Sequence, residues 1–377
     1  MEILHEENEG FDMLVSPGFY EGYVTYMTAM GAKVTVLNED IGGEIVKSET
    51  CQVRYKRNAI VVHNFRSFFN CYQKLADHHY FMENLAKAHP NKARTFNIGK
   101  SYKGKNITVI QISHNVDTSG HKPIIWIDGG MHGREWVSVT TPQWIAATLL
   151  GEVDTTLSGE LDELLDTYQF MILPISNPDG FEYSSNSNKL KKNARFWRKT
   201  RSDTGHKSCK GVDPNRNFDV NFGEHGVSTD KCDETYPGNQ AFTEKNTIAM
   251  RDFLTLNMAK IKLYISYHSY GQLLLKPFLY KNTRPSNAQI HDAASDAYVK
   301  ALFKKHGEVY RPIQGYELYR VSGASSSWMY KMGVVNSYTV EQRDKGVKGF
   351  VLPPDQIVPI GEENVRGLIA LVKQLRY

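Results

Sequence analysis

Short apolar runs alternate with longer helical patterns through most of this chain. Residues 107–113 are rich in β-branched side chains and alternate in polarity, which is typical of a half-buried strand. Four further runs have the length and continuous apolar character of buried strands: 123–128, 170–175, 261–267 and 334–340. Helical patterns lie between these runs, at 142–150, 243–257, 286–306 and 362–375. The alternation predicts an α/β fold, a mixed central sheet with helices on both faces.

The first 57 residues show a separate pattern. Strands are predicted at 11–15 and 33–37, and helices at 17–30 and 41–48, with Gly31 ending the first helix. We therefore expect a small α+β segment over residues 1–57 and a large domain over 58–377. The basic stretch Arg54–Arg57 joins them. A trypsin-like protease would cut there if the stretch is exposed, although a plain charged linker has the same composition.

Composition narrows the function classes. The 377 residues carry a formal net charge of +4, which is small for this length and implies no nucleic-acid partner. No apolar stretch reaches the roughly 20 residues of a membrane span. The first residues lack the charged and apolar regions of a signal peptide, which taken alone favours a cytosolic origin.

Chemically versatile residues follow the predicted strands. His132 lies just after the run that ends at Asp128, and Asn177 follows the run that ends at Ile175. His268 and Glu341 come directly after their own runs. Open α/β sheets bind ligands at the carboxyl ends of their strands, so we expect these positions to converge.

Three of these side chains suit a zinc ion. His132 and Glu135 are three residues apart, which on a turn entering a helix directs both side chains the same way. Imidazole nitrogen and carboxylate oxygen are both zinc ligands, and His268 is the natural third. Each also has an ordinary interpretation, because such His/Glu pairs occur on solvated helices and a histidine at a strand end can simply belong to the core.

A general base and an anion site complete the pattern. Zinc lowers the pKa of a bound water towards about 7, and Glu341 would take the proton; a salt bridge with Arg343 is the alternative. The fork of Arg216 fits a carboxylate, with Asn215 as a neutral donor, unless both lie on an ordinary surface loop. Arg198 could stabilise an oxyanion, or lie on a solvated face. Tyr319 could donate its phenol to a ligand, or be half-exposed without a role.

In this order the segments resemble the zinc metallocarboxypeptidases of the pancreatic carboxypeptidase A/B family. The similarity runs from about residue 60 to the C-terminus. The motifs that carry it are His-x-Arg-Glu-Trp, Asn-Pro-Asp-Gly, Phe-Trp-Arg-Lys-Thr-Arg, Asn-Arg-Asn-Phe-Asp, His-Ser-Tyr-x-Gln-Leu-Leu-Leu, Ser-Gly-Ala-Ser-Ser-Ser-Trp and Glu-x-Arg-Asp.

The resemblance implies a role for each matching position. One zinc ion per chain would be held by His132, Glu135 and His268. Glu341 would be the general base, and Arg198 would polarise the scissile carbonyl. The substrate's terminal carboxylate would be bound by Asn215, Arg216 and Tyr319, with Arg134 and Tyr270 lining the approach for upstream residues. Cys209 and Cys232 would form the family's loop disulfide, although two free buried thiols are also possible; Cys51 and Cys71 fit no clear pairing.

The N-terminal segment resembles the second half of the family's activation domain, with the first half missing. The resemblance implies a secreted, monomeric, digestive-type zymogen. A trypsin-like protease would activate it, the released enzyme would begin near Asn58, and proteinaceous carboxypeptidase inhibitors would be possible partners. Its substrates would be the C-termini of peptides and proteins.

The chain departs from the family pattern at the specificity pocket. Relatives that prefer apolar residues place a large aliphatic side chain at the floor, and those that prefer basic residues place an aspartate, whereas Ser326 matches that position here. Leu279 and Thr339 would form nearby walls. With Glu317 close in sequence, we expect a slight preference for C-terminal lysine or arginine over aliphatic, aromatic or small polar residues. A zinc amidohydrolase of acylamino acids and a non-catalytic binding module remain competing hypotheses.

Overall fold

The computed structural model describes residues 2–7, 10–49, 64–186 and 194–375. At its centre is one eight-stranded mixed sheet, in the order β3-β4-β6-β5-β7-β10-β8-β9. Its strands are β3 (Ala93–Lys100), β4 (Asn106–Ile112), β5 (Ile124–Asp128), β6 (Gln169–Leu173), β7 (Ile261–Ser269), β8 (Leu273–Lys276), β9 (Arg311–Gln314) and β10 (Asn336–Gln342). The predicted fold class is confirmed.

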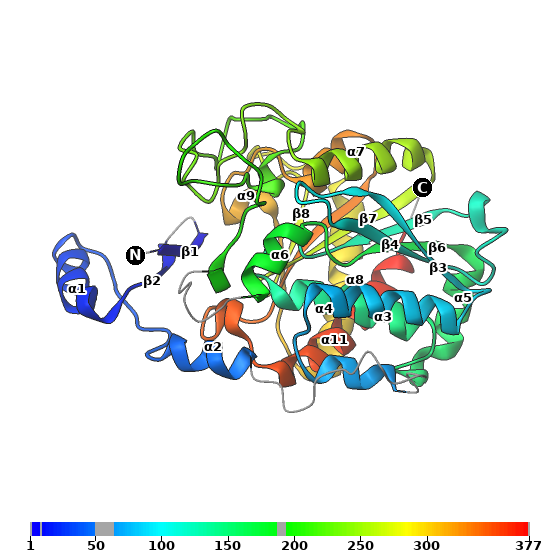
Figure 1. The fold of residues 1–377 in the computed structure, drawn as a ribbon. Helices are drawn as coiled ribbons and strands as arrows, with labels where there is room; N and C mark the ends of the chain where they lie inside the picture. Colours follow the sequence, from blue (N-terminus) through cyan, green and yellow to red (C-terminus); the bar gives the residue numbers. More distant parts are fainter. Residues whose placement is uncertain (1, 8–9, 50–63, 187–193, 376–377) are drawn as a thin grey trace.

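Helices cover both faces of this sheet (Figure 1). One layer contains α3 (Leu75–Ala88), α4 (Trp136–Leu149), α5 (Ser158–Thr167), α8 (Ala288–His306) and α11 (Ile357–Val372). The opposite layer contains α7 (Lys245–Asn257) and α10 (Ser325–Lys331). Successive side chains of β5 pack alternately against the two layers. Ile125 and Ile127 belong to one core cluster, and Ile124 and Trp126 belong to the other. A strand buried on both faces reads as a continuous apolar run.

The central strands determine where the site can form. β6, β5, β7 and β10 run parallel, so their carboxyl ends meet at one edge of the sheet. At that edge Glu341 of β10 pairs in register with His268 of β7. The short helix α6 (Pro178–Ser185) begins after β6 at the same edge. This geometry agrees with the expected convergence of the strand-end residues.

The N-terminal segment differs in part from its prediction. It contains a hairpin of β1 (Glu2–Glu7) and β2 (Gly10–Leu14), then α1 (Tyr20–Ala29) and α2 (Ile41–Glu49), and it lies to one side of the large domain (Figure 1). The strand predicted at 33–37 is wrong. These residues alternate in polarity, but they are largely exposed, and they pair with no strand in the part of the chain that the structure describes.

Two helices begin earlier than the sequence indicated. α4 starts at Trp136 and continues through Pro142, and α11 starts at Ile357. Proline lacks the donor that an interior helical position uses, so it suggested a helix start. In α4 every residue is buried, and packing outweighs the one lost hydrogen bond.

Several predictions fall outside the described residues. These are the boundary between residues 57 and 58, the basic stretch Arg54–Arg57, and Cys51. Among the described residues, no helix combines the length and apolar character that a membrane span requires.

Candidate metal centre and substrate cleft

Three buried side chains converge beyond the ends of β5 and β7. His132 lies in the turn after β5, Glu135 directly precedes α4, and His268 lies near the end of β7. The Nδ1 atoms of the two histidines are 3.2 Å apart. The Glu135 carboxylate oxygens lie 2.6 Å from Nδ1 of His132 and 3.0 Å from Nδ1 of His268. This donor set could hold one metal ion.

The far side of each imidazole is held by a polar partner. Nε2 of His132 lies 3.2 Å from Oδ1 of Asp213. Nε2 of His268 lies 3.1 Å from the Ser266 hydroxyl, which donates to Oδ1 of Asp128 at 2.6 Å. A serine that donates to a carboxylate accepts from the ring, so the proton of His268 is placed on Nε2. Both rings can then direct the lone pair of Nδ1 at the common centre, which is the arrangement expected around a catalytic metal.

Charge is concentrated around this centre. Burial alone would raise the pKa of Glu135, but His132 and His268 together hold it well below its usual value. Burial likewise opposes ionisation of Asp213, yet Arg198 and Arg216 keep the pKa of that carboxyl low. Both carboxylates are therefore charged at neutral pH.

Asp213 also fixes the predicted oxyanion arginine. Nε and one terminal nitrogen of Arg198 donate to Oδ2 of Asp213 at 3.0 and 2.9 Å. The other terminal nitrogen of Arg198 lies 3.9 Å from Oε1 of Glu135. The guanidinium is thus held beside the triad in a single orientation.

The predicted carboxylate-binding residues lie together. Arg216 is anchored by donating to the carbonyls of Gly226 and Asn215, at 2.8 and 3.1 Å, and its remaining nitrogen donates to the Tyr319 hydroxyl at 3.3 Å. Asn215 accepts a hydrogen bond from the first N–H of α10, that of Ser325. The loop that precedes α10 requires glycine at position 323. Its φ is 71°, and a Cβ atom on Gly323 would lie 2.0 Å from the Arg216 carbonyl oxygen.

One pocket of about 600 Å³ connects these groups. It is lined by His132 and Glu135 of the triad, by the predicted carboxylate-binding residues, and by Glu341. Apolar side chains complete the wall beyond Tyr319: Leu275, Leu279, Leu318 and Val321. Thr339 also lines the pocket, and its hydroxyl is 2.8 Å from that of buried Ser326.

The two predicted approach residues lie at the rim. The Arg134 guanidinium stacks over the Phe350 ring at 4.4 Å and forms an ion pair with Glu234. Tyr270 packs against Phe350 and donates its hydroxyl to Asp12 of β2 at 2.6 Å. The N-terminal segment therefore contacts the residues that would receive the upstream part of a peptide.

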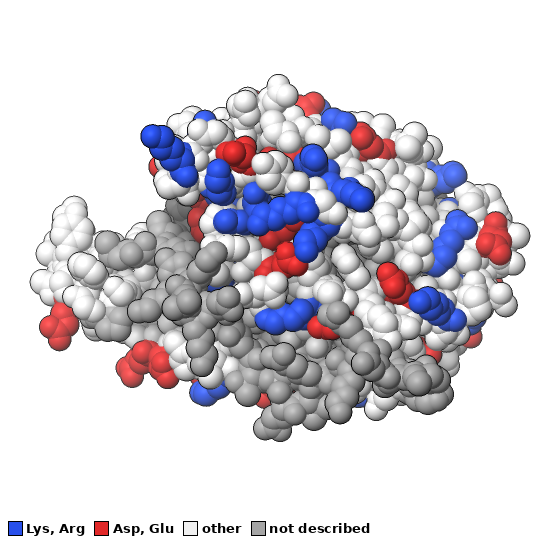
Figure 2. All heavy atoms as spheres, in the orientation of Figure 1, with Lys and Arg blue, Asp and Glu red and all other residues white. Residues whose placement is uncertain are grey.

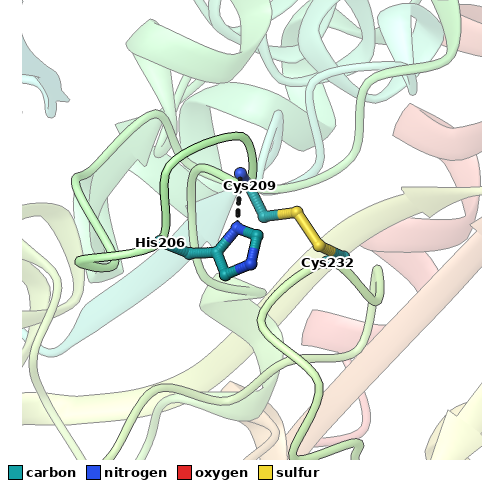
Figure 3. Close-up of side chains that lie close together, drawn as sticks. All are labelled: His206, Cys209 and Cys232. Atoms are coloured by element: carbon teal, nitrogen blue, oxygen red, sulfur yellow. Dashed lines mark hydrogen bonds between the residues drawn. A yellow bond between two sulfur atoms is a disulfide. The ribbon is translucent and has the colours of Figure 1, made fainter.

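Cys209 and Cys232 form a disulfide, with their Cα atoms 4.9 Å apart. His206 lies beside it, and its Nδ1 accepts from the Cys209 N–H at 3.2 Å (Figure 3). The two sulfur atoms are bonded to each other, so this cluster offers no thiolate to a metal. The disulfide fastens the loop that carries Asp233 and Glu234 along the pocket rim.

Sequence reasoning missed three supporting residues: Asp213, Ser266 and Asp128. Asp213 stands two residues before Asn215 within the arginine motif, and Asp128 ends an entirely apolar strand. A carboxylate at such a position is costly unless it is paired, which was the available signal. Ser266 carried no signal, because a serine within a strand is common.

Comparison with known proteins gives a consistent result. A family model described as zinc carboxypeptidase matches residues 78–367. The chain is 33% identical to carboxypeptidase A2 of Rattus norvegicus over 93% of this chain and 81% of the relative. It is 34% identical to zinc carboxypeptidase A 1 of Anopheles gambiae over 81% of this chain and 68% of the relative.

Solved structures agree. Thrombin activatable fibrinolysis inhibitor superposes with a TM-score of 0.83 at 29% identity, covering 97% of this chain and 87% of that one. Carboxypeptidase A from Helicoverpa armigera gives 0.81 at 25% identity, covering 96% and 87%. The bovine form of the first protein, in complex with a tick carboxypeptidase inhibitor, gives 0.73 at 32% identity, covering 81% and 98%.

The hydrogen bonds that link His268 to Ser266 and Ser266 to Asp128, here called the relay, yield a prediction about metal affinity. Replacing Ser266 by alanine removes the acceptor for Nε2, so the ring loses its fixed orientation. We expect zinc to bind roughly 10- to 100-fold more weakly, measured by competition with a chromogenic chelator. Ser113→Ala, which removes another buried serine hydroxyl far from the triad, is the matched control and should bind zinc normally. Equal affinities in the two variants would show that the relay does not position the ligand.

Proposed function

Because the chain belongs to the zinc carboxypeptidase family and is a metallocarboxypeptidase, we propose that it binds one zinc ion per chain through His132, Glu135 and His268 and removes single residues from the C-termini of peptides and proteins. The observation that carries this proposal is one pocket that joins two members of the triad, His132 and Glu135, to the Asn215–Arg216–Tyr319 group. The distance between them would set the cleavage at the terminal peptide bond.

The chain's own residues would divide the chemistry as follows. When bound, zinc supplies a Lewis acid that activates water and polarises the scissile carbonyl. Glu341 accepts a proton from that water as the water oxygen adds to the carbonyl carbon. Arg198, held by Asp213, stabilises the negative charge that develops on the carbonyl oxygen. Glu341 then returns the proton to the departing amine nitrogen as the C–N bond breaks.

The role of Glu341 can be separated from metal binding. Glu341→Gln keeps the size of the side chain but removes its basicity, so turnover should fall roughly 100- to 10,000-fold. Zinc content, measured by elemental analysis after dialysis, should remain about one equivalent. Glu317→Gln, which changes an exposed side chain of the short helix α9 (Gly315–Leu318), is the control and should keep full activity. Undiminished turnover in Glu341→Gln would overturn the mechanism.

The carboxylate-binding group predicts an exopeptidase. A substrate with an amidated C-terminus cannot form the charged pair with Arg216, so kcat/KM should drop at least about 100-fold relative to the free acid. The comparison needs two peptides that differ only in this group. Equal cleavage of both would show that Asn215, Arg216 and Tyr319 do not bind the terminus.

The preference for the C-terminal residue is the finest part of the proposal. The sequence favoured lysine or arginine, because Ser326 and Thr339 are polar and Glu317 is close. In the folded chain the two hydroxyls hydrogen-bond to each other, and Glu317 is exposed. The apolar part of the pocket wall is formed by Leu275, Leu279, Leu318 and Val321. These contacts support an aliphatic terminal residue, which is one of the alternatives to lysine or arginine that the sequence analysis left open.

This preference can be measured directly. Burying a leucine side chain contributes about 2 kcal/mol, whereas a buried ammonium without a partner is strongly disfavoured. We expect peptides ending in leucine to be cleaved at least about 100-fold faster than matched peptides ending in lysine. Ser326→Asp should reverse the order by adding a buried charge. Faster release of lysine by the unaltered enzyme would restore the basic preference.

The N-terminal segment supports synthesis as a zymogen. Besides the Asp12–Tyr270 bond, Glu44 of α2 forms an ion pair with Lys348 at 2.9 Å, and acidic side chains are visible on this segment in Figure 2. Apolar residues of the segment, Leu14, Ile41 and Ile45, pack against a cluster that includes Tyr270 and Phe350. A segment placed here would exclude peptides until a trypsin-like protease separated it from the enzyme.

The same proposal covers location and partners. Disulfides persist in oxidising compartments, so Cys209–Cys232 supports a secreted protein. A structural neighbour was solved with a tick carboxypeptidase inhibitor, and its similarity supports proteinaceous inhibitors as partners here. We propose that the enzyme acts as a monomer, because a pocket that is complete within one chain needs no second copy to form.

A further inference from the structure

Cys71 is engaged in a second disulfide. It follows the short helix η2 (Phe65–Asn70), is only 4% exposed, and its sulfur is disulfide-bonded. The chain has four cysteines, and Cys209 and Cys232 are bonded to each other. Cys51, which lies outside the described residues, is the one remaining cysteine. We infer that Cys51 and Cys71 form a cross-link that ties the N-terminal segment to the catalytic domain.

The position of this cross-link in the sequence matters. Cys51 precedes the basic stretch Arg54–Arg57 and Cys71 follows it. A protease that cuts within this stretch opens the backbone between the two cysteines. The N-terminal segment then remains covalently attached through sulfur, and cleavage by itself does not release it. This step rests on the zymogen proposal, whereas the cross-link does not.

Retention would keep the segment on the cleft. Asp12, Asn38 and Glu44 each bond to the rim, through Tyr270, the Val347 carbonyl and Lys348. Together with the packing of Leu14, Ile41 and Ile45, these contacts hold the segment without a covalent bond, so a segment cut free of the chain would dissociate on sufficient dilution. A short tether raises the local concentration of the segment to about the millimolar range, which is enough to keep weak contacts formed. Cutting the chain and activating the enzyme thus become separate events.

The sulfur chemistry balances by thiol–disulfide exchange. The thiols of Cys51 and Cys71 are oxidised by a disulfide of a protein or small molecule, which leaves as two thiols and carries both protons. Release reverses this step, when a dithiol reduces the cross-link and is itself oxidised to a disulfide. Burial of Cys71 slows access by a reductant, so the link should outlast the cleavage.

The cross-link is tested by peptide mapping of the full chain. Free thiols are blocked under denaturing conditions, the protein is digested with pepsin at low pH to prevent exchange, and linked peptides are identified by mass spectrometry without reduction. We expect one species joining Cys51 to Cys71 and one joining Cys209 to Cys232. Blocked thiols at Cys51 and Cys71, or any other partner for Cys71, including a second copy of the chain, would overturn the inference.

The consequence for activation is tested by comparing the chain with a Cys51→Ser/Cys71→Ser variant, which keeps Cys209–Cys232. Both are cut with trypsin, checked by N-terminal sequencing for cleavage between residues 51 and 71, and diluted. On a denaturing gel without reductant the unaltered chain should stay one species, whereas the variant should separate into two. The cut variant should hydrolyse a peptide at least about tenfold faster than the cut unaltered chain.

Equal activity of the two cut proteins would overturn the regulatory role while leaving the cross-link in place. If neither cut protein hydrolyses any peptide, the proposed function fails, and the peptide map still decides the cross-link. The two proposals are therefore refuted by different results.

Discussion

One buried carboxylate, that of Asp213, organises the whole site. It accepts two hydrogen bonds from Arg198, lies 3.2 Å from the ring of His132, and accepts the N–H of Asn215 at 2.9 Å. A candidate metal ligand, the arginine proposed to stabilise the oxyanion and the loop proposed to bind the substrate carboxylate are thereby fixed relative to one anion. Removing one partner of such a buried cluster leaves uncompensated charge, which typically costs about 3–5 kcal/mol. The charged groups proposed to act in catalysis are therefore also the groups that hold these loops together.

The sheet and the site were predictable to different degrees. Continuous apolar runs identified β5, β6, β7 and β10, because strands buried on both faces leave a strong pattern. Three strands of the sheet were missed. β8 and β9 have only four residues each, too few to show a period, and the edge strand β3 has mixed burial and no continuous apolar run. At residues 33–37 the polarity alternates, but the described residues include no strand paired with them, and a strand forms only by hydrogen bonding to a partner.

Within the site, motif residues were identifiable and their supports were not. His132, Glu135 and His268 could be identified because imidazole and carboxylate groups are common metal ligands. Ser266 does not, and its importance depends on a distance of 3.1 Å to an imidazole that is two residues away in sequence. Ser326 shows the same limitation. It looks polar in sequence, but in the folded chain it is buried and its hydroxyl is 2.8 Å from that of Thr339, a contact that the sequence does not reveal.

The in-register pairing of His268 with Glu341 has a consequence for misfolding. Side chains alternate between the two faces of a strand, so a slip of one residue between β7 and β10 would turn the glutamate towards the opposite helix layer. Such a sheet could still bury most of its apolar surface and resist denaturation. It would nevertheless lack catalytic activity, and stability measurements alone would not distinguish it from the native protein.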